Sequence, residues 1–435
     1  MRFARHSRPD WVGEIPVSER ARRRITRRLI PFLFVLYIIA FLDRVNTGYA
    51  GLQMTKELGF SNEVFGFGSG IFFIGYVLLE IPGTLLVEMW SARKWIARIM
   101  ITWGFMAALT GLVHTAPQFY WARFLLGVAE AGFFPGVIVY LTHWYREEDR
   151  AKAIAMFMSA IPVSQILGSP ISAGLMKIHW LGYSGWRWLL ILEGLPAVIL
   201  GIVTLFYLTD RPKDARWLPE EERDWITGEL ERERSDKAAG RPSGIWQAFR
   251  NRDVLILTVA YFFGANIQYG LALWLPKMVE KLSGFGPFET TLITAIPFVL
   301  AWPTMLLIGW SSDRTRERRW HTAIPLFAAG AGLALTRLNA GIGMGIVAFS
   351  IAAMGVNGRL PAFWALPGTF LTGASAAAVI GAINCIGNTG GFVGPYVIGW
   401  LSNETGTYAS AVLYLIGSAV AAGALVLCVR SGRCG

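Results

Sequence analysis

The sequence predicts an all-α polytopic membrane protein whose twelve transmembrane helices form two pseudo-symmetric six-helix bundles. Three observations lead to this fold class. The 435 residues are 54% hydrophobic and only 16% charged, which is too apolar for a soluble chain of this length. Apolar stretches long enough to cross a bilayer core, about 20 residues each, recur along the whole chain. The second half of the chain also repeats residues of the first half at a constant spacing.

The expected spans fall into two groups of six, separated by a charged stretch. The first group covers residues 29–53, 66–88, 95–114, 118–144, 152–176 and 187–208. The second covers residues 254–276, 289–310, 321–337, 342–366, 375–401 and 408–429. We therefore expect an N-terminal tail (1–28), an N-terminal six-helix bundle (29–208), a linker (209–252), a C-terminal six-helix bundle (253–430) and a short C-terminal tail (431–435).

Lys and Arg side chains are concentrated on one side of this topology. Loops rich in these residues stay on the cytoplasmic side of a bilayer. Only five of the 40 fall in the loops of the opposite side, namely Lys56, Lys177, Lys277, Lys281 and Arg337. We therefore expect a multi-pass protein of the cell membrane (inner or plasma) with both termini cytoplasmic. The net charge of +11 reflects this topology, so no nucleic-acid partner is expected.

The linker contains the segment PEEERDWITGELERERSDK, which mixes both charge signs at helical spacing and predicts an amphipathic surface helix. A solvated connector between the halves is the favoured interpretation, and a regulatory element is the alternative. The three cysteines, Cys385, Cys428 and Cys434, show neither metal-ligand spacing nor a disulfide pattern. We expect no metal site and no cofactor.

A shift of 225 residues superimposes two parts of the first half on the second. In the loops after the second and eighth spans it places Glu88 on Asp313, Arg93 and Lys94 on Arg318 and Arg319, and Trp95 on Trp320. In the fifth and eleventh spans it places Pro170 on Pro395 and Gly174 on Gly399. Two halves related by an axis along the membrane normal produce this pattern, and transporters of that design hold their cargo near the midplane between the halves.

The segments EMWSARKW and SDRTRERRW, which form these matched loops, resemble the signature of the major facilitator superfamily and its echo in the second half. The segments LDRVN, GYVLLEIP, RFLLGVAEAGFFPG, GWRW, LEGLPA, FWALP and GNTGGFVGPYVIGWL are similar to those of its anion:cation symporter branch. Bacterial permeases for tartrate, phthalate and sugar acids belong to that branch. The resemblance covers nearly the whole chain beyond the N-terminal tail.

The resemblance implies secondary active transport of a small organic acid anion by alternating access, and no enzymatic activity. An anion entering a negative-inside cell works against about 2.3 kcal/mol per charge per 100 mV, so accumulation requires cations that move with it. Protons suit a site built from carboxylates, whereas sodium would need an oxygen-rich cage that the sequence does not show. The expected partners are therefore a small organic anion, protons and the lipid bilayer, and we expect a monomer.

The signature loops also imply a gating role for their charged residues. The first loop departs from the family pattern, because Glu88, Met89 and Ser91 stand where Asp, Arg and Gly are usual. Its latch should therefore depend more on Arg93 and Lys94. The full set expected to act in gating or as structural charges is Glu88, Arg93, Lys94, Arg123, Asp313, Arg314, Arg318 and Arg319.

Charged side chains inside a span are costly, about 2.5–3.5 kcal/mol each at a helix centre, so each is a candidate functional group. Asp43 and Arg44 are adjacent and point about 100° apart on a helix, so they should face different partners. Arg44 can bind a substrate carboxylate through two donors in one plane, and Asp43 can load and release a proton. The alternative for both is an interhelical ion pair without a role in turnover.

Arg123 and Glu130 are seven residues apart and share one face of the fourth span. The match to the AEAG segment of the family implies that Glu130 is the coupling proton site, and the alternative is a purely structural bond. Arg123 is either functional or a structural or gating partner of an acidic group. Glu80 and Glu193 lie where helices pack or end, so we interpret them as structural.

The shift of 225 residues places Asp43 on Gln268 and Arg44 on Tyr269. The N-terminal half should therefore bind the carboxylate and the proton, while the uncharged groups of the C-terminal half contact the rest of the cargo. Further substrate-contact candidates at mid-depth, each with an interhelical contact as the alternative, are Tyr76, Gln165, Trp364, Asn384 and Asn388.

Arg359 departs from the family pattern, which has a small residue before the proline that leads to FWALP. Facing the cavity, it would provide a second anion contact and favour dianionic cargo. The alternative is that it snorkels to the cytoplasmic interface.

Three other functions remain as alternatives. An exporter or an uncoupled anion exchanger would use the same fold, and a membrane sensor that binds without transport would present the same residues. A membrane enzyme is disfavoured because the five histidines are scattered and no nucleophile motif is present. A primary pump is disfavoured because no GxxxxGK[ST] phosphate loop occurs in the sequence.

Overall fold

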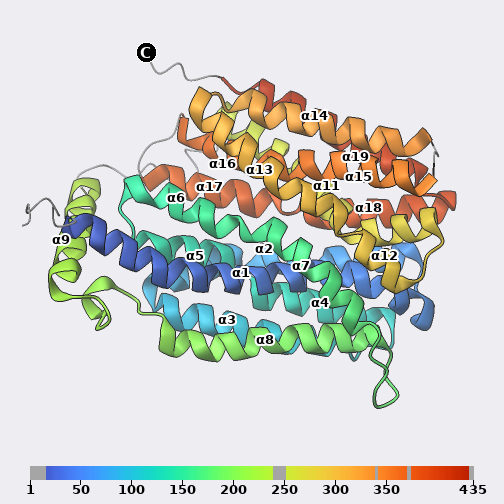
Figure 1. Ribbon diagram of the computed structural model, residues 1–435, viewed down its shortest axis with the longest axis horizontal. Coiled ribbons are helices and arrows are strands. Elements are labelled where there is room, and N and C mark those ends of the chain that lie inside the picture. Colours follow the sequence, from blue (N-terminus) through green and yellow to red (C-terminus); the bar gives the residue numbers. More distant parts are fainter. Residues whose placement is uncertain (1–15, 239–250, 339–340, 370–373, 431–435) are drawn as a thin grey trace, which may run out of the picture.

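The computed structural model describes residues 16–238, 251–338, 341–369 and 374–430. In these ranges every regular element is a helix, apart from one isolated β-bridge between Trp180 and Tyr183. Figure 1 shows the helices running side by side along the long axis, with the N-terminal half in the lower part of the view and the C-terminal half above it.

Twelve helical passes follow one another along the chain, several of them broken into two helices. The N-terminal half contains α1 (Val17–Leu58), α2 (Asn62–Met89), α3 (Ala92–Thr110), α4 (Ala116–Glu130) with α5 (Phe133–Thr142), α6 (Glu147–Met158) with α7 (Ala160–Leu175), and α8 (Gly185–Tyr207). The C-terminal half contains α11 (Arg252–Ser283), α12 (Pro287–Ile293) with α13 (Ile296–Thr315), α14 (Arg319–Leu335), α15 (Gly341–Gly358) with α16 (Leu360–Ala365), α17 (Ala374–Gly387) with α18 (Gly390–Thr405), and α19 (Ala409–Leu427).

Nine of these passes are long and apolar enough to cross a membrane, counted over the described residues alone. Two of the others show why they miss that criterion. Helix α3 carries Arg93, Lys94 and Arg98 in its first two turns, and α14 is 17 residues long. Both lie among the other passes in the bundle, α3 against α8 and α14 against α15 and α19, so neighbouring helices make up for their weaker apolar signal.

Helix α1 begins at Val17, earlier than the expected start of the first span at residue 29. The apolar ruler marks only the part of a helix that meets lipid, whereas this polar extension is stabilised by the linker helix. Arg20 binds Glu221 at 2.7 Å and Arg24 binds Glu222 at 2.9 Å. The expected tail of residues 1–28 is therefore helical from Val17 onward, and residues 1–15 lie outside the described ranges.

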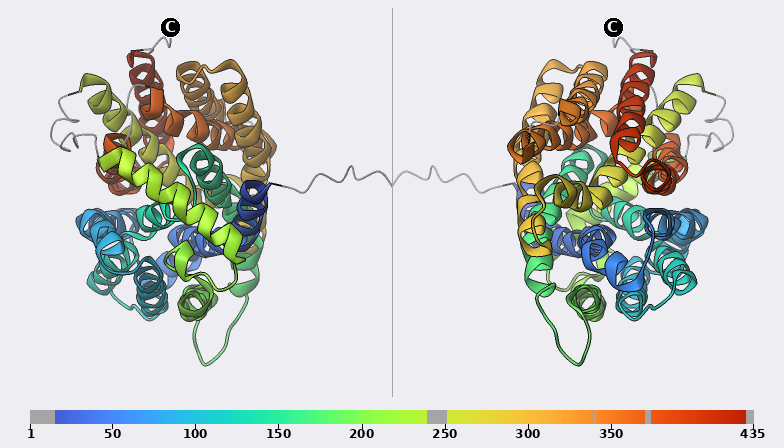
Figure 2. Two further views of the ribbon diagram at one scale, coloured as in Figure 1. Left: turned by 90° about the vertical axis from the view of Figure 1, so that its left-hand side faces the viewer. Right: turned by 90° about the vertical axis from the view of Figure 1, so that its right-hand side faces the viewer.

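The linker helix expected at residues 219–237 is present as α9 (Glu220–Ala238), after a short 3-10 turn, η1 (Pro212–Asp214). It buries Ile226 and Leu230 and lies across one end of the bundle (Figure 2, left). We call this the terminal end, because α1 begins and α19 ends there (Figure 1). The opposite end, which carries the loops after α1 and α11, is the far end.

The two halves are related by the repeat that the sequence shows. Arg44 in α1 donates to the hydroxyl of Tyr269 in α11 at 3.1 Å, and these residues are 225 positions apart. One helical turn later, a Cβ on Gly48 would lie 2.9 Å from the carbonyl oxygen of Leu273, which is again 225 positions away. Equivalent residues of two halves can touch only at the axis that relates them. The α1–α11 contact therefore marks the pseudo-two-fold axis.

At the far end the halves pack backbone against backbone. A Cβ on Gly66 in α2 would lie 2.5 Å from the carbonyl oxygen of Pro395 in α18, and one on Gly399 would lie 2.4 Å from that of Asn62. Glycine is required at such positions because any side chain would separate the helices. An ion pair between Lys56 and Glu280 at 2.6 Å also joins the two halves there. The structure is therefore closed at the far end.

Within the N-terminal half, Gly127 of α4 lies against the backbone of α2, and a Cβ there would be 1.9 Å from the carbonyl oxygen of Phe72. Gly127→Ala should lower the free energy of unfolding by about 1–3 kcal/mol, because α2 and α4 must separate. Thermal unfolding of the purified protein in detergent measures this change. Gly417→Ala is the matched control, since nothing lies within 4 Å of a Cβ on Gly417. Equal melting temperatures for the two variants would contradict the packing argument.

Candidate functional site

A cavity of about 400 Å³ lies between the two halves, and each half contributes seven of its lining residues. The N-terminal half supplies Tyr37, Phe41, Arg44, Tyr76, Phe134, Met158 and Ile161, and the C-terminal half supplies Tyr261, Gln268, Tyr269, Leu360, Trp364, Asn384 and Asn388. Seven of the eight substrate-contact candidates from the sequence are in this lining. Gln165 is buried in α7 but does not line the cavity.

Arg44 is the one cationic side chain in this lining. One nitrogen of its guanidinium forms an ion pair with Glu130, and another donates to Tyr269 across the pseudo-two-fold axis. The rings of Phe41, Phe72 and Tyr76 surround it at 5.1–5.9 Å. Aromatic faces attract a cation without neutralising its charge. The guanidinium is therefore held in place while its charge stays available to an anion in the cavity.

Glu130 reaches Arg44 because of a break in the helix. It is the last residue of α4, and the chain then turns through Gly132, whose φ of +83° favours glycine, before α5 begins. The carboxylate is completely buried, and its second oxygen has no hydrogen-bond partner among the described residues. The AEAG segment thus builds both the helix break and the carboxylate.

Asp43 and Arg123 form a second layer behind Arg44. Asp43 accepts a hydrogen bond from Asn46 at 3.0 Å, so it faces away from the partners of Arg44, as the sequence predicts. Arg123 lies over the ring of Phe72 at 5.0 Å and interacts electrostatically with both Asp43 and Glu130. Two cations and two carboxylates are therefore buried together. Asp43, Arg123 and Glu130 do not line the cavity themselves.

The other two buried carboxylates of the first half have hydrogen-bond partners. Glu193 accepts from Ser172 at 3.0 Å within that half. Glu80 accepts from Asn384 at 2.6 Å, and Asn384 belongs to the other half. The interpretation of Glu80 as a structural residue thus gains a specific form: it joins the two halves beside the cavity. Its partner is itself bonded to Tyr261 at 3.2 Å, a lining residue that the sequence analysis missed.

Sequence reasoning missed seven lining residues, all of them aromatic or aliphatic: Tyr37, Phe41, Phe134, Met158, Ile161, Tyr261 and Leu360. Apolar side chains are common on every face of a membrane helix, so composition cannot separate those at the cavity from those facing lipid. Their distance of 225 positions from Gln268-type partners in the other half is the one signal that could have located some of them.

Arg359 does not snorkel, so that interpretation is wrong. It lies between α15 and α16 and is 1% exposed. One of its nitrogens donates to the carbonyl oxygen of Gly264 at 2.9 Å and to the side-chain oxygen of Gln268 at 3.1 Å. Arg359 does not line the cavity, but its partner Gln268 does.

The signature loops make contacts within their own halves. In the first loop, Asp210 accepts from the Ser91 hydroxyl at 2.8 Å and from the backbone N–H of Arg93 at 2.9 Å, while the Arg93 side chain donates to Leu205. Lys94 lies 6.0 Å from the ring of Trp90. Ser91, which departs from the family pattern, therefore anchors the loop. The side chain of Glu88 lies outside the described residues.

The second loop follows the same pattern. Arg318 pairs with Asp313 at 2.6 Å, Arg319 donates to the carbonyl oxygen of Leu427, and Arg314 lies 5.4 Å from the ring of Trp310. A latch between the halves at this end would need partners from the opposite half. None is found for these residues in the described part of the chain, so their gating role stays a prediction.

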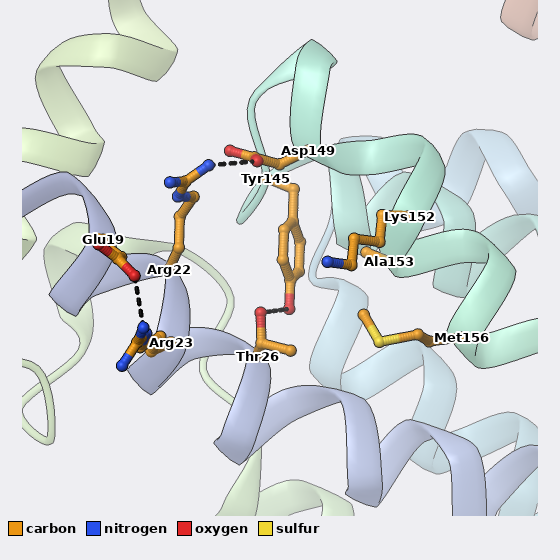
Figure 3. Close-up of a pocket in the computed structure, with 9 residues that line it drawn as sticks. All are labelled: Glu19, Arg22, Arg23, Thr26, Tyr145, Asp149, Lys152, Ala153 and Met156. Carbon is orange, nitrogen blue, oxygen red and sulfur yellow. Dashed lines mark hydrogen bonds and ion pairs between the residues drawn. The ribbon is translucent and has the colours of Figure 1, made fainter. Parts of the chain in front are cut away.

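A second pocket lies at the terminal end between α1 and α6 (Figure 3). Its charged residues pair with each other, Arg22 with Asp149 at 3.0 Å and Arg23 with Glu19 at 2.5 Å, and Tyr145 donates to Thr26. It is more open than the central cavity, but it contains none of the buried ionisable groups of the spans. We therefore assign the candidate site to the central cavity.

Two six-helix halves around a polar cavity, with ionisable side chains buried in the spans, define a multi-pass membrane transporter rather than an enzyme. The description "Major Facilitator Superfamily" applies to the family whose pattern matches residues 33–395. The chain therefore belongs to the major facilitator superfamily, as its motifs predict.

Individual relatives agree with this assignment. A protein of Agrobacterium vitis named "Putative tartrate transporter" is 44% identical over 94% of this chain and 91% of its own length. The inner membrane transport protein RhmT of Escherichia coli is 38% identical over 93% of this chain and 94% of its own. A D-xylose–proton symporter of known structure shares the fold, with a TM-score of 0.72 at 15% identity over 94% of this chain and 98% of that one.

The Arg44–Glu130 pair should show the energetics of a buried ion pair. Arg44→Gln leaves a buried carboxylate without its main partner, and breaking such pairs costs about 3–5 kcal/mol. The double variant Arg44→Gln, Glu130→Gln should recover part of that loss. Thermal unfolding in detergent at pH 8 compares the three proteins. Arg20→Gln, which breaks the exposed pair with Glu221, is the control and should cost at most about 1 kcal/mol. A double variant no more stable than Arg44→Gln would contradict this.

Proposed function

We propose that the protein is a secondary active transporter that takes up a small organic acid anion together with protons by alternating access. The observation that carries this proposal is the position of Arg44, whose guanidinium lines the cavity and is bound to the buried carboxylate of Glu130. A substrate carboxylate and Glu130 compete for the same cation. Anion binding and the charge state of Glu130 are therefore linked.

The link follows from the cost of buried charge. When a substrate carboxylate binds Arg44 through two parallel hydrogen bonds, Glu130 loses its ion pair. A buried carboxylate without a partner is strongly unfavourable and takes up a proton instead. Substrate and proton then occupy the site together as a pair of lower net charge. Release of the proton restores the Arg44–Glu130 pair and expels the anion.

Asp43 is proposed as a second proton site on the same grounds. It is 1% exposed, and one of its oxygens has no hydrogen-bond partner among the described residues. Its electrostatic partner Arg123 also interacts with Glu130, so a change at one carboxylate is felt by the other. The tartrate named for the Agrobacterium vitis relative supports a carboxylate as cargo. Sugar acids and aromatic acids are the other carboxylates that suit this site.

Proton coupling is tested by uptake of L-tartrate into proteoliposomes with and without an imposed pH gradient. The wild-type protein should accumulate tartrate only with the gradient. Glu130→Gln should lose gradient-driven accumulation, because the amide cannot release a proton, and should still exchange internal for external tartrate. Glu404→Gln, at an exposed position, is the control and should behave as the wild type.

The outcomes separate the alternatives. Tartrate exchange without any response to the gradient in the wild type would identify an uncoupled exchanger, and gradient-driven loss from loaded vesicles would identify an exporter. Binding without flux would identify a sensor. Each of these results would overturn proton-coupled uptake.

We also propose that both termini, and hence the terminal end, face the cytoplasm, because that end carries the Arg-rich start of α1 and the charged helix α9. A fluorescent protein that matures only in the cytoplasm, fused after Gly435, should fluoresce in intact cells. The same protein inserted after Gly182, in the loop at the far end, should stay dark. The reverse pattern would show that the orientation is inverted.

A further inference from the structure

Arg359 is a buried cation without a counter-ion. Its side chain is 1% exposed, and both of its printed hydrogen bonds go to neutral oxygens, those of Gly264 and Gln268. It forms no ion pair with a carboxylate in the described part of the chain. Removing a guanidinium from water without pairing its charge is unfavourable. A feature this costly needs a partner that the protein itself does not supply.

The surrounding sequence makes room for this charge. A Cβ on Gly264 would lie 2.8 Å from the central carbon of the Arg359 guanidinium, so any other residue at this position would displace it. Glycine in the middle of α11 weakens the helix, yet it lets the guanidinium lie directly against the backbone. Arg359 is thus held by a cradle in α11 rather than left at the edge of a helix.

Arg359 also determines which end of the Gln268 amide faces the cavity. A guanidinium can only donate hydrogen bonds, so the amide oxygen of Gln268 must be the atom that faces it. The amide nitrogen then points away from Arg359, and Gln268 is a lining residue of the cavity. The C-terminal half therefore presents an N–H donor to the cavity, polarised by the cation behind it.

The two halves thus offer different electrostatic environments to the cargo. In the N-terminal half the charge of Arg44 is offset by Glu130, whereas in the C-terminal half the charge of Arg359 is not offset. Gln268 is next in sequence to Tyr269, which bonds to Arg44, so both environments meet at one cavity. An anion with one carboxylate at Arg44 and a second toward Gln268 matches both.

We propose that Arg359, acting through Gln268, makes the cavity selective for a cargo with two negative charges, a dicarboxylate rather than a monocarboxylate. This inference rests on the proposed transport of an organic anion. Arg359 is a positioning residue in this scheme: Gln268 contacts the second carboxylate, and Arg359 orients the amide and supplies the field.

The test compares L-tartrate with its monoamide, tartramate, in which one carboxylate is replaced by an uncharged group of the same shape. Uptake into proteoliposomes at a fixed pH gradient gives a KM for each. The wild type should prefer tartrate, and Arg359→Gln should reduce the ratio of the two KM values about tenfold, through a higher KM for tartrate alone. Arg359→Lys, which keeps the charge, should retain most of the preference.

Two further variants make the result independent of the stability of one protein. Gln268→Glu places a carboxylate beside Arg359, cancels its charge and should remove the preference while Arg359 stays in place. Arg314→Gln, at an exposed position in the same half, is the control and should keep the wild-type ratio. An equal rise of both KM values in Arg359→Gln and in Gln268→Glu, with the ratio unchanged, would show a structural role and overturn the inference.

Failure of the proposed function gives a different result. In that case the wild type transports neither tartrate nor tartramate, and the inference falls with it. A wild type that transports both with equal KM overturns the dicarboxylate preference alone and leaves organic-anion transport standing.

Discussion

The arrangement of this protein depends on one constraint, the cost of an unpaired charge inside a bilayer. Arg44 and Glu130 satisfy it together in the closed cavity, and each is positioned by a different element, α1 and the broken end of α4. Because the pair is buried, neither partner can leave unless another ion or a proton replaces it. This converts a local ion pair into a link between anion and proton. The aromatic residues around Arg44 keep that link confined to the cavity side.

The two-fold architecture supplies the motion that such a link needs. Equivalent residues of α1 and α11 meet at the axis, and glycines of α2 and α18 bring the halves into backbone contact at the far end. Contacts of this kind separate as units, because small residues have no side chains that interlock. The Glu80–Asn384 bond, by contrast, joins the halves beside the cavity through polar groups. Cargo that engages Asn384 competes with that bond, which couples occupancy to the relation between the halves.

Sequence symmetry and chemical symmetry part at the site. Asp43 and Arg44 match Gln268 and Tyr269 under the shift of 225 residues, so one half carries charge where the other carries neutral donors and acceptors. Arg359 partly restores a charge to the second half from a different helix, between α15 and α16. The gene-level repeat thus provides the frame, and divergence within it provides the distinct ends that an asymmetric cargo requires.

The sequence alone determined the number and approximate ends of the spans, the repeat and the short set of ionisable residues inside it, because bilayer crossing depends on local hydrophobicity along the chain. It also placed Arg44, Gln268, Tyr269 and the two asparagines correctly at one depth. Only the tertiary structure decided which carboxylate pairs with Arg44, that Glu80 reaches the other half, and that Arg359 turns inward to Gln268. These pairings join residues far apart in the chain, and they depend on how each helix is rotated and where it breaks, as at Gly132, which hydrophobic patterns do not encode.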